Sequence, residues 1–156
     1  MKFYKANKNI KGGATSFSFN PDRENGGFFA EMIKQISWDE KTRTGKFDTT
    51  EENKIRIKFS VNEICEMMNI CTSRSGSAQF FHKTASSQTQ ISFGTYPKDS
   101  DSPRGIAFSA KKGDNSIFVP FSFAEATYLA EIFHFFIQRH LLVEQKSQEA
   151  YFANKS

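Results

Sequence analysis

One phrase occurs twice in this chain, and it limits the folds that the chain can adopt. Residues 54–70 read KIRIKFSVNEICEMMNI, and residues 116–132 read SIFVPFSFAEATYLAEI. Both copies begin with apolar residues at every second position, which predicts a strand with one buried face. Both continue with Phe-Ser-x-x-Glu, which is typical of a helix N-terminus where Ser is the N-cap and Glu bonds back to it. The sequence therefore predicts the same strand–helix unit twice.

The similarity between the two halves extends upstream of these units. In each half, short alternating segments separated by turn residues predict three earlier strands. These strands are expected at residues 3–9, 14–19 and 28–38 in the first half and at residues 80–86, 88–93 and 105–112 in the second half.

We therefore expect an α+β fold made of two tandem ββββα repeats, at about residues 3–72 and 78–143. One antiparallel sheet with one helix is marginal alone, so each helix should pack on the sheet of the other repeat and form a pseudo-dimer. This gives a single domain over residues 1–143. Residues 144–156 are polar and are expected to form a flexible tail.

Charge and aromatic content are compatible with a nucleic-acid partner. The chain has 21 Lys and Arg against 17 Asp and Glu, and the excess lies in residues 1–58, which hold 12 basic and 8 acidic residues. The chain also has 18 Phe, more than one core usually needs. Some of these rings are therefore expected to contact nucleobases or a second subunit.

Catalytic and metal sites are not expected. Cys65 and Cys71 match no zinc or redox spacing, and the three His residues form no ligand pattern with them. The chain also lacks a phosphate-binding loop and a nucleophile elbow. We expect no enzyme, no cofactor, no metal and no small-molecule substrate. We interpret both cysteines as small buried groups, and unpaired cysteines of this kind indicate a reducing compartment. With no signal peptide and no membrane-spanning run, we expect a cytoplasmic protein without a membrane partner.

Cations and rings that alternate with core positions are the candidate nucleic-acid contacts. Lys54, Arg56 and Lys58 should point outward. In the strand expected at residues 28–38, alternate residues lie on the same face. One of the two faces contains Phe28, Lys34 and Trp38, the only Trp, and we expect it to be the binding face. The hairpin that follows and the lysines that flank Gly12–Gly13 add further cations near a turn that a phosphate can approach. The full candidate set is Lys8, Lys11, Phe28, Lys34, Trp38, Arg43, Lys46, Phe47, Lys54, Arg56 and Lys58.

Alternatives remain at several of these positions. The cations also suit an ordinary solvated sheet face, and Trp38 also suits a core anchor. The neighbours Phe80 and Phe81 should point to opposite faces, and the pattern does not choose which of them is buried. Rings around most of the second helix indicate that it also forms a subunit interface.

Four segments resemble the whirly family of single-stranded-DNA-binding proteins. IKGGAT (10–15) partly matches its lysine–glycine–lysine–alanine–alanine–leucine stretch, and ISWDEKTRTGKF (36–47) resembles its tryptophan-containing hairpin. AQFFHK (78–83) resembles the opening of its second repeat, and FVPFSFAEATYL (118–129) resembles its last strand and helix. The similarity covers about residues 3–143.

The resemblance implies a homo-oligomer, with a tetramer favoured over a dimer, that binds single-stranded DNA with little sequence preference. Such a protein acts in DNA replication, recombination or transcription. The chain has Gly13 where the family motif has its second lysine, a departure that bears on higher-order assembly and on the contact that this lysine makes. No transit peptide is expected, so a bacterial cell or a virus-infected host cell is the expected setting. A single-stranded-RNA-binding or annealing factor, and a protein-assembly module that binds no nucleic acid, remain the alternatives.

Overall fold

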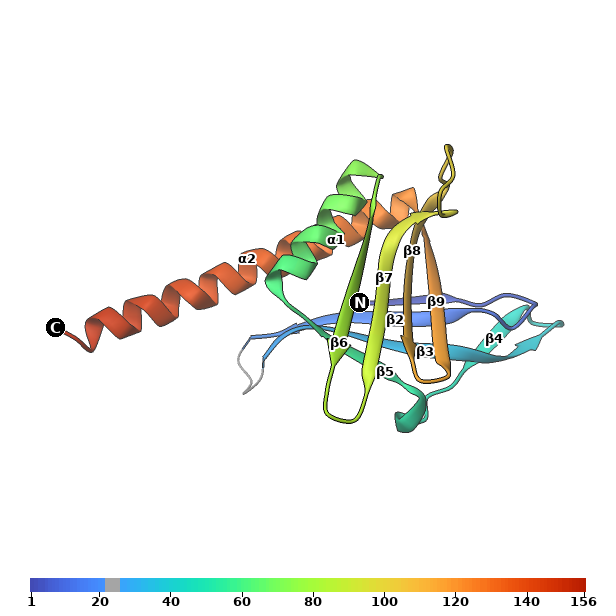
Figure 1. The fold of residues 1–156 in the computed structure, drawn as a ribbon, viewed down its shortest axis with the longest axis horizontal. Helices are drawn as coiled ribbons and strands as arrows, with labels where there is room; N and C mark the ends of the chain where they lie inside the picture. The colour runs from blue at the N-terminus through green and yellow to red at the C-terminus, as the bar shows by residue number, and fades with distance from the viewer. Residues whose placement is uncertain (22–25) are drawn as a thin grey trace.

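The computed structural model describes residues 1–21 and 26–156, which form two antiparallel sheets and two long helices (Figure 1). The first sheet contains β1 (Lys2–Lys5), β2 (Gly13–Asn20), β3 (Gly27–Asp39), β4 (Thr44–Phe47) and β5 (Ile55–Phe59). The second sheet contains β6 (Ser77–Lys83), β7 (Gln88–Tyr96), β8 (Gly105–Lys112) and β9 (Asn115–Ser122). The helices are α1 (Val61–Ser73) and α2 (Phe123–Ala153), and a short 3-10 turn, η1, covers Glu51–Asn53.

The long strand β3 organises the first sheet. Its first half pairs with β2 on one side and with β5 on the other, up to Met32 opposite Ile55. Its second half continues beyond β5 and pairs with β4, with an irregularity in register between Gln35 and Ser37. The short strand β4 is the return arm of the hairpin over residues 36–47, and it adds a fifth strand to the four that were predicted for this repeat.

Both predicted helix starts are confirmed as capping boxes. Ser60 Oγ accepts a hydrogen bond from the Glu63 amide at 3.2 Å, and the Glu63 carboxylate accepts one from the Ser60 amide at 2.9 Å. Ser122 and Glu125 form the same pair of bonds, both at 3.1 Å. Each box satisfies backbone N–H groups that have no partner within the helix.

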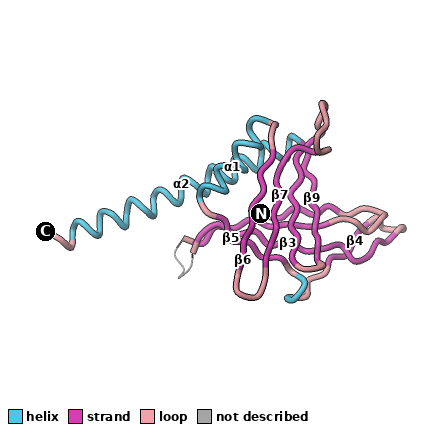
Figure 2. Tube along the Cα trace, viewed as in Figure 1, coloured by secondary structure: helices cyan, strands magenta, loops and turns pink. Residues whose placement is uncertain are grey.

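The two sheets and both helices share one core, and the predicted α+β fold with two sheet–helix repeats is confirmed. The strands of the two sheets cross steeply, and the helices pack against each other beside them (Figures 1 and 2). α1 packs on β6 and β7 of the second repeat. On α2, Phe133 lies edge-on to Phe17 of β2, with ring centroids 5.4 Å apart, and Phe136 lies 5.9 Å from Phe28 of β3. α1 therefore packs on the sheet of the other repeat, while α2 packs on both sheets, because it also contacts β8 and β9 of its own repeat.

α2 is longer than expected. It continues to Ala153 rather than ending near residue 143, and it takes in most of the segment that was expected to be a flexible tail. Every side chain in residues 144–153 is exposed, and this part projects away from the sheets in Figure 1. Glu, Gln, Lys and Ala dominate the extension, and these residues favour helix even where nothing packs on them. Gln145 also donates to Glu149 one turn later, at 3.1 Å.

Within the described residues, neither helix has an apolar stretch long enough to cross a membrane.

Candidate nucleic-acid interface

The outer face of the first sheet presents the predicted cations of β5, with which we count Lys54 directly before the strand, and acidic residues bind two of them. Arg56 Nε lies 3.0 Å from the Glu31 carboxylate, and Arg56 also binds Glu51 at 2.7 Å. Lys54 lies 2.8 Å from Glu51 and 3.5 Å from Glu31. Hydrogen bonds from Lys54 and Arg56 lower the pKa of Glu51. A phosphate at this position would therefore compete with two carboxylates for the same cations.

Lys58 points outward from the same strand. It lies opposite Phe29 in the β3–β5 register, and its ammonium group is 5.8 Å from the centroid of that ring. This geometry is within the range of a cation–π contact. The pair combines a positive charge with a half-buried aromatic side chain at the outer surface.

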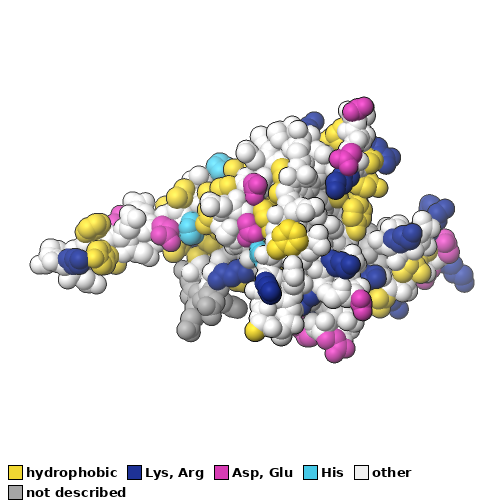
Figure 3. Space-filling model, viewed as in Figure 1, with side chains coloured by type: hydrophobic (Ala, Val, Ile, Leu, Met, Phe, Trp, Pro, Cys, Tyr) yellow, Lys and Arg dark blue, Asp and Glu magenta, His cyan; other side chains and the backbone are white. Residues whose placement is uncertain are grey.

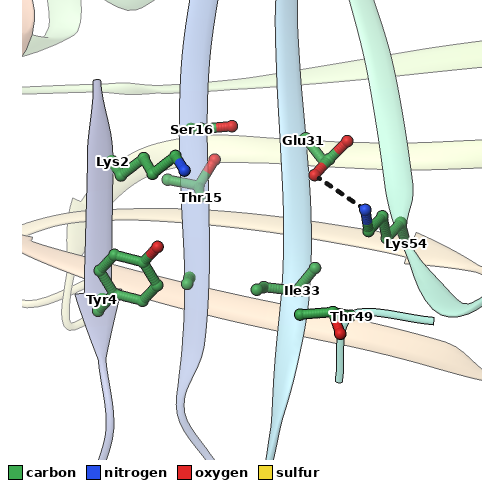
Figure 4. A pocket seen from close by; sticks show the side chains of 9 residues that line it. Lys2, Tyr4, Thr15, Ser16, Glu31, Ile33, Thr49 and Lys54 are labelled. Carbon is green, nitrogen blue, oxygen red and sulfur yellow. Dashed lines mark ion pairs between the residues drawn. The ribbon is translucent and has the colours of Figure 1, made fainter. Parts of the chain in front are cut away.

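A groove of about 220 Å³ crosses this face between β1 and β5. Figure 4 shows Lys2 and Tyr4 on one side and Glu31 and Lys54 on the other, with the ion pair between the last two drawn. Tyr4 is 57 % exposed, and its ring lies 5.4 Å from that of Phe47 on β4. The predicted contact Phe47 is therefore half-buried behind a more exposed ring that the prediction did not include.

The first half of β3 faces the opposite way from the prediction. Phe28 was expected to contact nucleic acid, but it is 2 % exposed and stacks on Phe19 with ring centroids 4.8 Å apart. It belongs to the core, and the prediction that it contacts nucleic acid was wrong. The outer face of this half of the strand contains Phe29, Glu31 and Ile33.

The reason lies in the strand itself. Residues 28–33 have apolar side chains on both faces, so alternation alone does not choose the buried face. Lys34 and Trp38 decided the prediction, but they sit at or beyond the end of the pairing with β5. The irregularity between Gln35 and Ser37 also separates Trp38 from the first half of the strand. Lys34 is exposed and Trp38 is half-buried.

Gln35 fixes the end of the sheet where the remaining predicted cations gather. It is 1 % exposed, and its Oε1 accepts hydrogen bonds from the amides of Asn7 and Gly12, both at 3.0 Å. Its Nε2 donates to the carbonyls of Asn7 at 2.9 Å and Ser37 at 3.0 Å. One buried side chain therefore joins the loop over residues 6–12 to the β3–β4 hairpin.

We call this end of the molecule the cationic tip. Figure 3 shows its Lys and Arg side chains gathered at the right-hand end, over the β3–β4 hairpin. Among the described residues, none of its six cations lies within 4.0 Å of a carboxylate. All six are exposed, and they are Lys8, Lys11, Lys34, Lys41, Arg43 and Lys46.

Two carboxylates near the cationic tip, Asp39 and Asp48, accept local hydrogen bonds. Asp39 accepts backbone hydrogen bonds from Lys41 at 2.8 Å and Thr42 at 3.1 Å, and the bonds from Thr42 and Lys41 lower its pKa. Asp48 accepts bonds from Thr50 and Asn53, which lower its pKa as well. These two carboxylates shape the turns, and the charge of Lys46 also contributes to the lowered pKa of Asp39.

Gly12 and Gly13 do not have the predicted role. Both are buried, and a Cβ at Gly12 would collide with the carbonyl oxygen of Lys5. A Cβ at Gly13 would meet Ile117 and Phe118 of β9. The glycines are needed for close packing inside the protein, so Lys8 and Lys11, rather than this backbone, are the groups available to a phosphate.

The second sheet has an outer groove that sequence reasoning missed. Its volume is about 320 Å³, and small side chains from β7 and β8, including Ser92 and Ser109, form its floor. Tyr96 and Phe118 stand at its edge, with ring centroids 5.4 Å apart, and Arg104 lies 5.9 Å from the Tyr96 ring. No acidic side chain in the described part of the chain lines this groove.

Phe81 lies on the same outer face, and this settles the alternative left open at Phe80 and Phe81. Phe80 is 8 % exposed in the core, and Phe81 is 57 % exposed. The internal repeat relates Phe81 to a ring in the first half of the chain. Phe81 aligns with Tyr4, and the two rings have the same exposed fraction. Comparing the two halves would therefore have indicated that both rings face the same way.

Other polar groups have structural roles or no clear partner. No group of three or more His, Cys, Asp or Glu in the described residues is placed to hold a metal ion. Burial raises the pKa of the Cys71 thiol to about 12, so it stays protonated at neutral pH. The indole Nε1 of Trp38 is buried without an acceptor among the described residues.

The arrangement of sheets and helices is similar to a known structure. It matches the structure of the plant transcriptional regulator PBF-2 with a TM-score of 0.62 and 18 % sequence identity, over 93 % of this chain and 85 % of that chain. The fold is whirly-like. No known protein-family model matches the chain, and no curated protein matches it. The whirly-like fold expected from the four sequence segments is thus confirmed by the three-dimensional arrangement rather than by sequence identity.

Proposed function

We propose that this chain is a single-stranded DNA-binding protein with little sequence preference. The observation that supports this best is the combination of two surfaces. One is the cationic tip, whose cations lie within 4.0 Å of no carboxylate among the described residues, and the other is the outer sheet faces that expose rings. Phe28 leaves the proposed contact set because it is buried. The proposed contacts are Lys8, Lys11, Lys34, Trp38, Arg43, Lys46, Phe47, Lys54, Arg56 and Lys58, together with Tyr4, Phe81, Tyr96 and Phe118.

Both surfaces suit a single strand. Lys and Arg side chains bind phosphates through charge, and this binding ignores base identity. Unpaired bases stack on exposed rings, which also accept any base. Binding by phosphate charge and stacking together gives affinity without a sequence code. The whirly-like fold supports the same proposal.

The partners and setting are part of the proposal. We propose a non-catalytic role in DNA replication, recombination or transcription, by a homo-oligomer in which a tetramer is favoured over a dimer. The two free cysteines suit the cytoplasm, of a bacterial cell or of a virus-infected host cell.

One observation favours a second candidate. Lys54 and Arg56 are already bound by Glu31 and Glu51, so the cations of β5 are partly neutralised. A protein-assembly module without nucleic acid would have such a face.

The test is fluorescence anisotropy of labelled dT, rU and duplex DNA of about 30 nucleotides, measured over a salt series. The proposal predicts tight binding to dT, weaker binding to duplex and a steep loss of affinity with salt. Tighter binding to rU than to dT would indicate an RNA-binding protein. No binding to any of the three at low salt would overturn the proposal in favour of the assembly module.

A further inference from the structure

The groove on the outer face of the first sheet runs along β2, between the side chains of β1 and β3 (Figure 4). Two short side chains, Ala14 and Ser16, form its floor. On one side Tyr4 pairs with Ala14, and on the other Glu31 pairs with Ser16. β1 and β3 are two strand spacings apart, about 9–10 Å. One flat base can therefore lie over the floor, in contact with Tyr4 and with one edge toward Glu31.

The size of this groove suits a single base. Its volume is about 220 Å³, which is below the range of about 300–1,000 Å³ that is usual for the sites of drug-sized ligands. Among the described residues that line the groove, Glu31 has the one carboxylate, and the other polar side chains are hydroxyls and two lysines. Glu31 is therefore the strongest hydrogen-bond acceptor that the groove offers to a base.

Two cations fix the position of the Glu31 carboxylate without occupying all of its acceptor sites. Lys54 Nζ lies 3.5 Å from Oε1, and Arg56 Nε lies 3.0 Å from Oε2. A carboxylate oxygen accepts about two hydrogen bonds, so each oxygen keeps one site for a ligand. The side chain is 36 % exposed and lines the groove. A ligand in the groove can therefore donate to both oxygens.

Guanine is the base whose edge fits a carboxylate with two open acceptor sites. Its Watson–Crick edge presents two adjacent donors, N1–H and the N2 amino group. Thymine presents one N–H between two carbonyls, and in adenine and cytosine the amino group adjoins an acceptor nitrogen, which a carboxylate repels. Two donors on one carboxylate form bidentate, charge-assisted hydrogen bonds. Lys2, on the opposite side of the groove, can donate to the N7 or O6 acceptor of the same base.

We propose that the groove of the first sheet is a guanine subsite, in which the two oxygens of Glu31 accept hydrogen bonds from N1–H and the N2 amino group of a guanine in the bound strand. This inference rests on the proposed function and deepens it, because it names the base that is preferred at one position. The remaining contacts are to phosphates and ring faces and ignore base identity. The groove of the second sheet has no acidic side chain in the described part of the chain, so the preference belongs to the first sheet.

The experiment compares two labelled strands of about 30 nucleotides by fluorescence anisotropy at one salt concentration. One strand repeats dT-dT-dG. The other repeats dT-dT-dI, because deoxyinosine keeps N1–H and lacks only the N2 amino group. The wild type is expected to bind the guanine strand about tenfold more tightly, as one bidentate base contact gives. A dT strand of the same length measures the affinity that does not depend on the base.

Two variants separate the carboxylate from the cations that it binds. Glu31→Gln should abolish the preference, because a carboxamide replaces one acceptor with a donor. It also releases Lys54 and Arg56, which should raise the affinity for both strands alike. Glu51→Gln is the matched control, since Glu51 binds the same two cations but does not line the groove, so the tenfold ratio should remain. Circular dichroism of each variant confirms that the fold is kept.

The outcomes distinguish the subsite from the proposed function. A wild-type ratio near one, with clear binding to the dT strand, would overturn the guanine subsite and leave the proposed function standing. The subsite is also wrong if Glu31→Gln keeps the wild-type ratio, or if Glu51→Gln loses it. Absence of binding to the dT strand at low salt would overturn the proposed function, and the guanine subsite with it.

Discussion

The Glu63 carboxylate lies 2.8 Å from Nε2 of His82, and this contact joins the two repeats. Glu63 belongs to the capping box of α1, and His82 lies on the first strand of the second repeat. The other repeat contains the equivalent pair. Lys5, which aligns with His82, lies 2.6 and 2.5 Å from the two carboxylate oxygens of Glu125. Each capping glutamate therefore has a second function, because it ties its helix to the other repeat's first strand.

Removal of the cation from one of these pairs should destabilise the fold. Lys5→Ala is expected to lower the free energy of unfolding by about 1–2 kcal/mol, since the pair is partly buried and charge-assisted. Urea denaturation measures this change. Lys2→Ala removes an exposed lysine from the same strand and is expected to cost less than about 0.5 kcal/mol. Equal losses from the two variants would show that the Glu125 contact contributes no specific stability.

The same pair predicts a pH dependence. Partial burial raises the pKa of Glu125, but hydrogen bonds from Lys5 and Ser122 outweigh this effect, so the net pKa lies below its usual value. A lowered folded-state pKa gives stability that is present above the unfolded-state pKa and is lost as the pH falls through the folded-state pKa. Between about pH 5 and pH 3, wild type should therefore lose more stability than Lys5→Ala. Parallel pH profiles of unfolding free energy for the two proteins would contradict this.

Gln35 should be more important for stability than any other polar side chain at the cationic tip. Gln35→Ala leaves the buried amide of Gly12 without its acceptor and removes four hydrogen bonds. We expect a loss of about 2–4 kcal/mol in unfolding free energy, together with weaker DNA binding because the two loops separate. Chemical denaturation and anisotropy test the two effects. Gln90→Ala, at an exposed position of β7, should change neither.

Cations of the tip should matter more for DNA binding than those of β5. Lys11→Ala and Arg43→Ala should each reduce the slope of log affinity against log salt by about 0.7, as expected for one lost phosphate contact on a single strand. Arg56→Ala should have a smaller effect, because Glu31 and Glu51 already bind Arg56. For the same reason, Glu51→Gln should tighten binding.

Lys155→Ala, at the far end of the chain, is the matched control for these charge changes and should leave the slope unaltered. If Arg56→Ala reduces the slope as much as Arg43→Ala does, the ion pairs of β5 open on binding and the first sheet contacts the phosphates directly.

Exposed rings of the second sheet should contribute to the affinity for DNA without changing how that affinity depends on salt concentration. Phe81→Ala and Phe118→Ala are each expected to cost about 1–3 kcal/mol of binding free energy if a base stacks on the ring. Their salt slopes should match that of wild type, because no cation is removed. The same anisotropy titrations give both quantities. Tyr151→Ala removes a similarly exposed ring on α2, and DNA binding should tolerate it. Wild-type affinity in both sheet variants would remove this groove from the proposed interface.

Features that depend on neighbouring residues were predictable from the sequence. The capping boxes at Ser60 and Ser122 rest on contacts within four residues, and their repetition revealed the two sheet–helix units. Phe59 was predictable as a core residue because its strand alternates cleanly between apolar and charged positions, and Phe121 occupies the same place before the N-cap serine of the second unit. In each case one local physical rule determines the outcome.

Features that depend on distant residues were not predictable in the same way. The buried face of β3 is set by Phe19 and Phe59 on the neighbouring strands, since residues 28–33 of β3 include apolar side chains on both faces. The pairing of Arg56 with Glu31 joins residues 25 positions apart, and no periodic pattern signals it. The local sequence does not distinguish Gln35 from an exposed strand glutamine, because its burial depends on contacts with the distant loop over residues 6–12.

Covalent fusion of the two repeats has a consequence for how the outer surfaces can specialise. In a dimer of identical single repeats, any substitution would appear on both sheets at once. Here each sheet is encoded by its own part of the chain, and the two outer faces differ: the first contains Lys54, Arg56 and Glu31, and the second contains Ser92, Ser109 and Phe118. One chain thus presents two chemically different outer sheet faces in a fixed relative orientation. Mutations can change the binding properties of either face without changing the shared core.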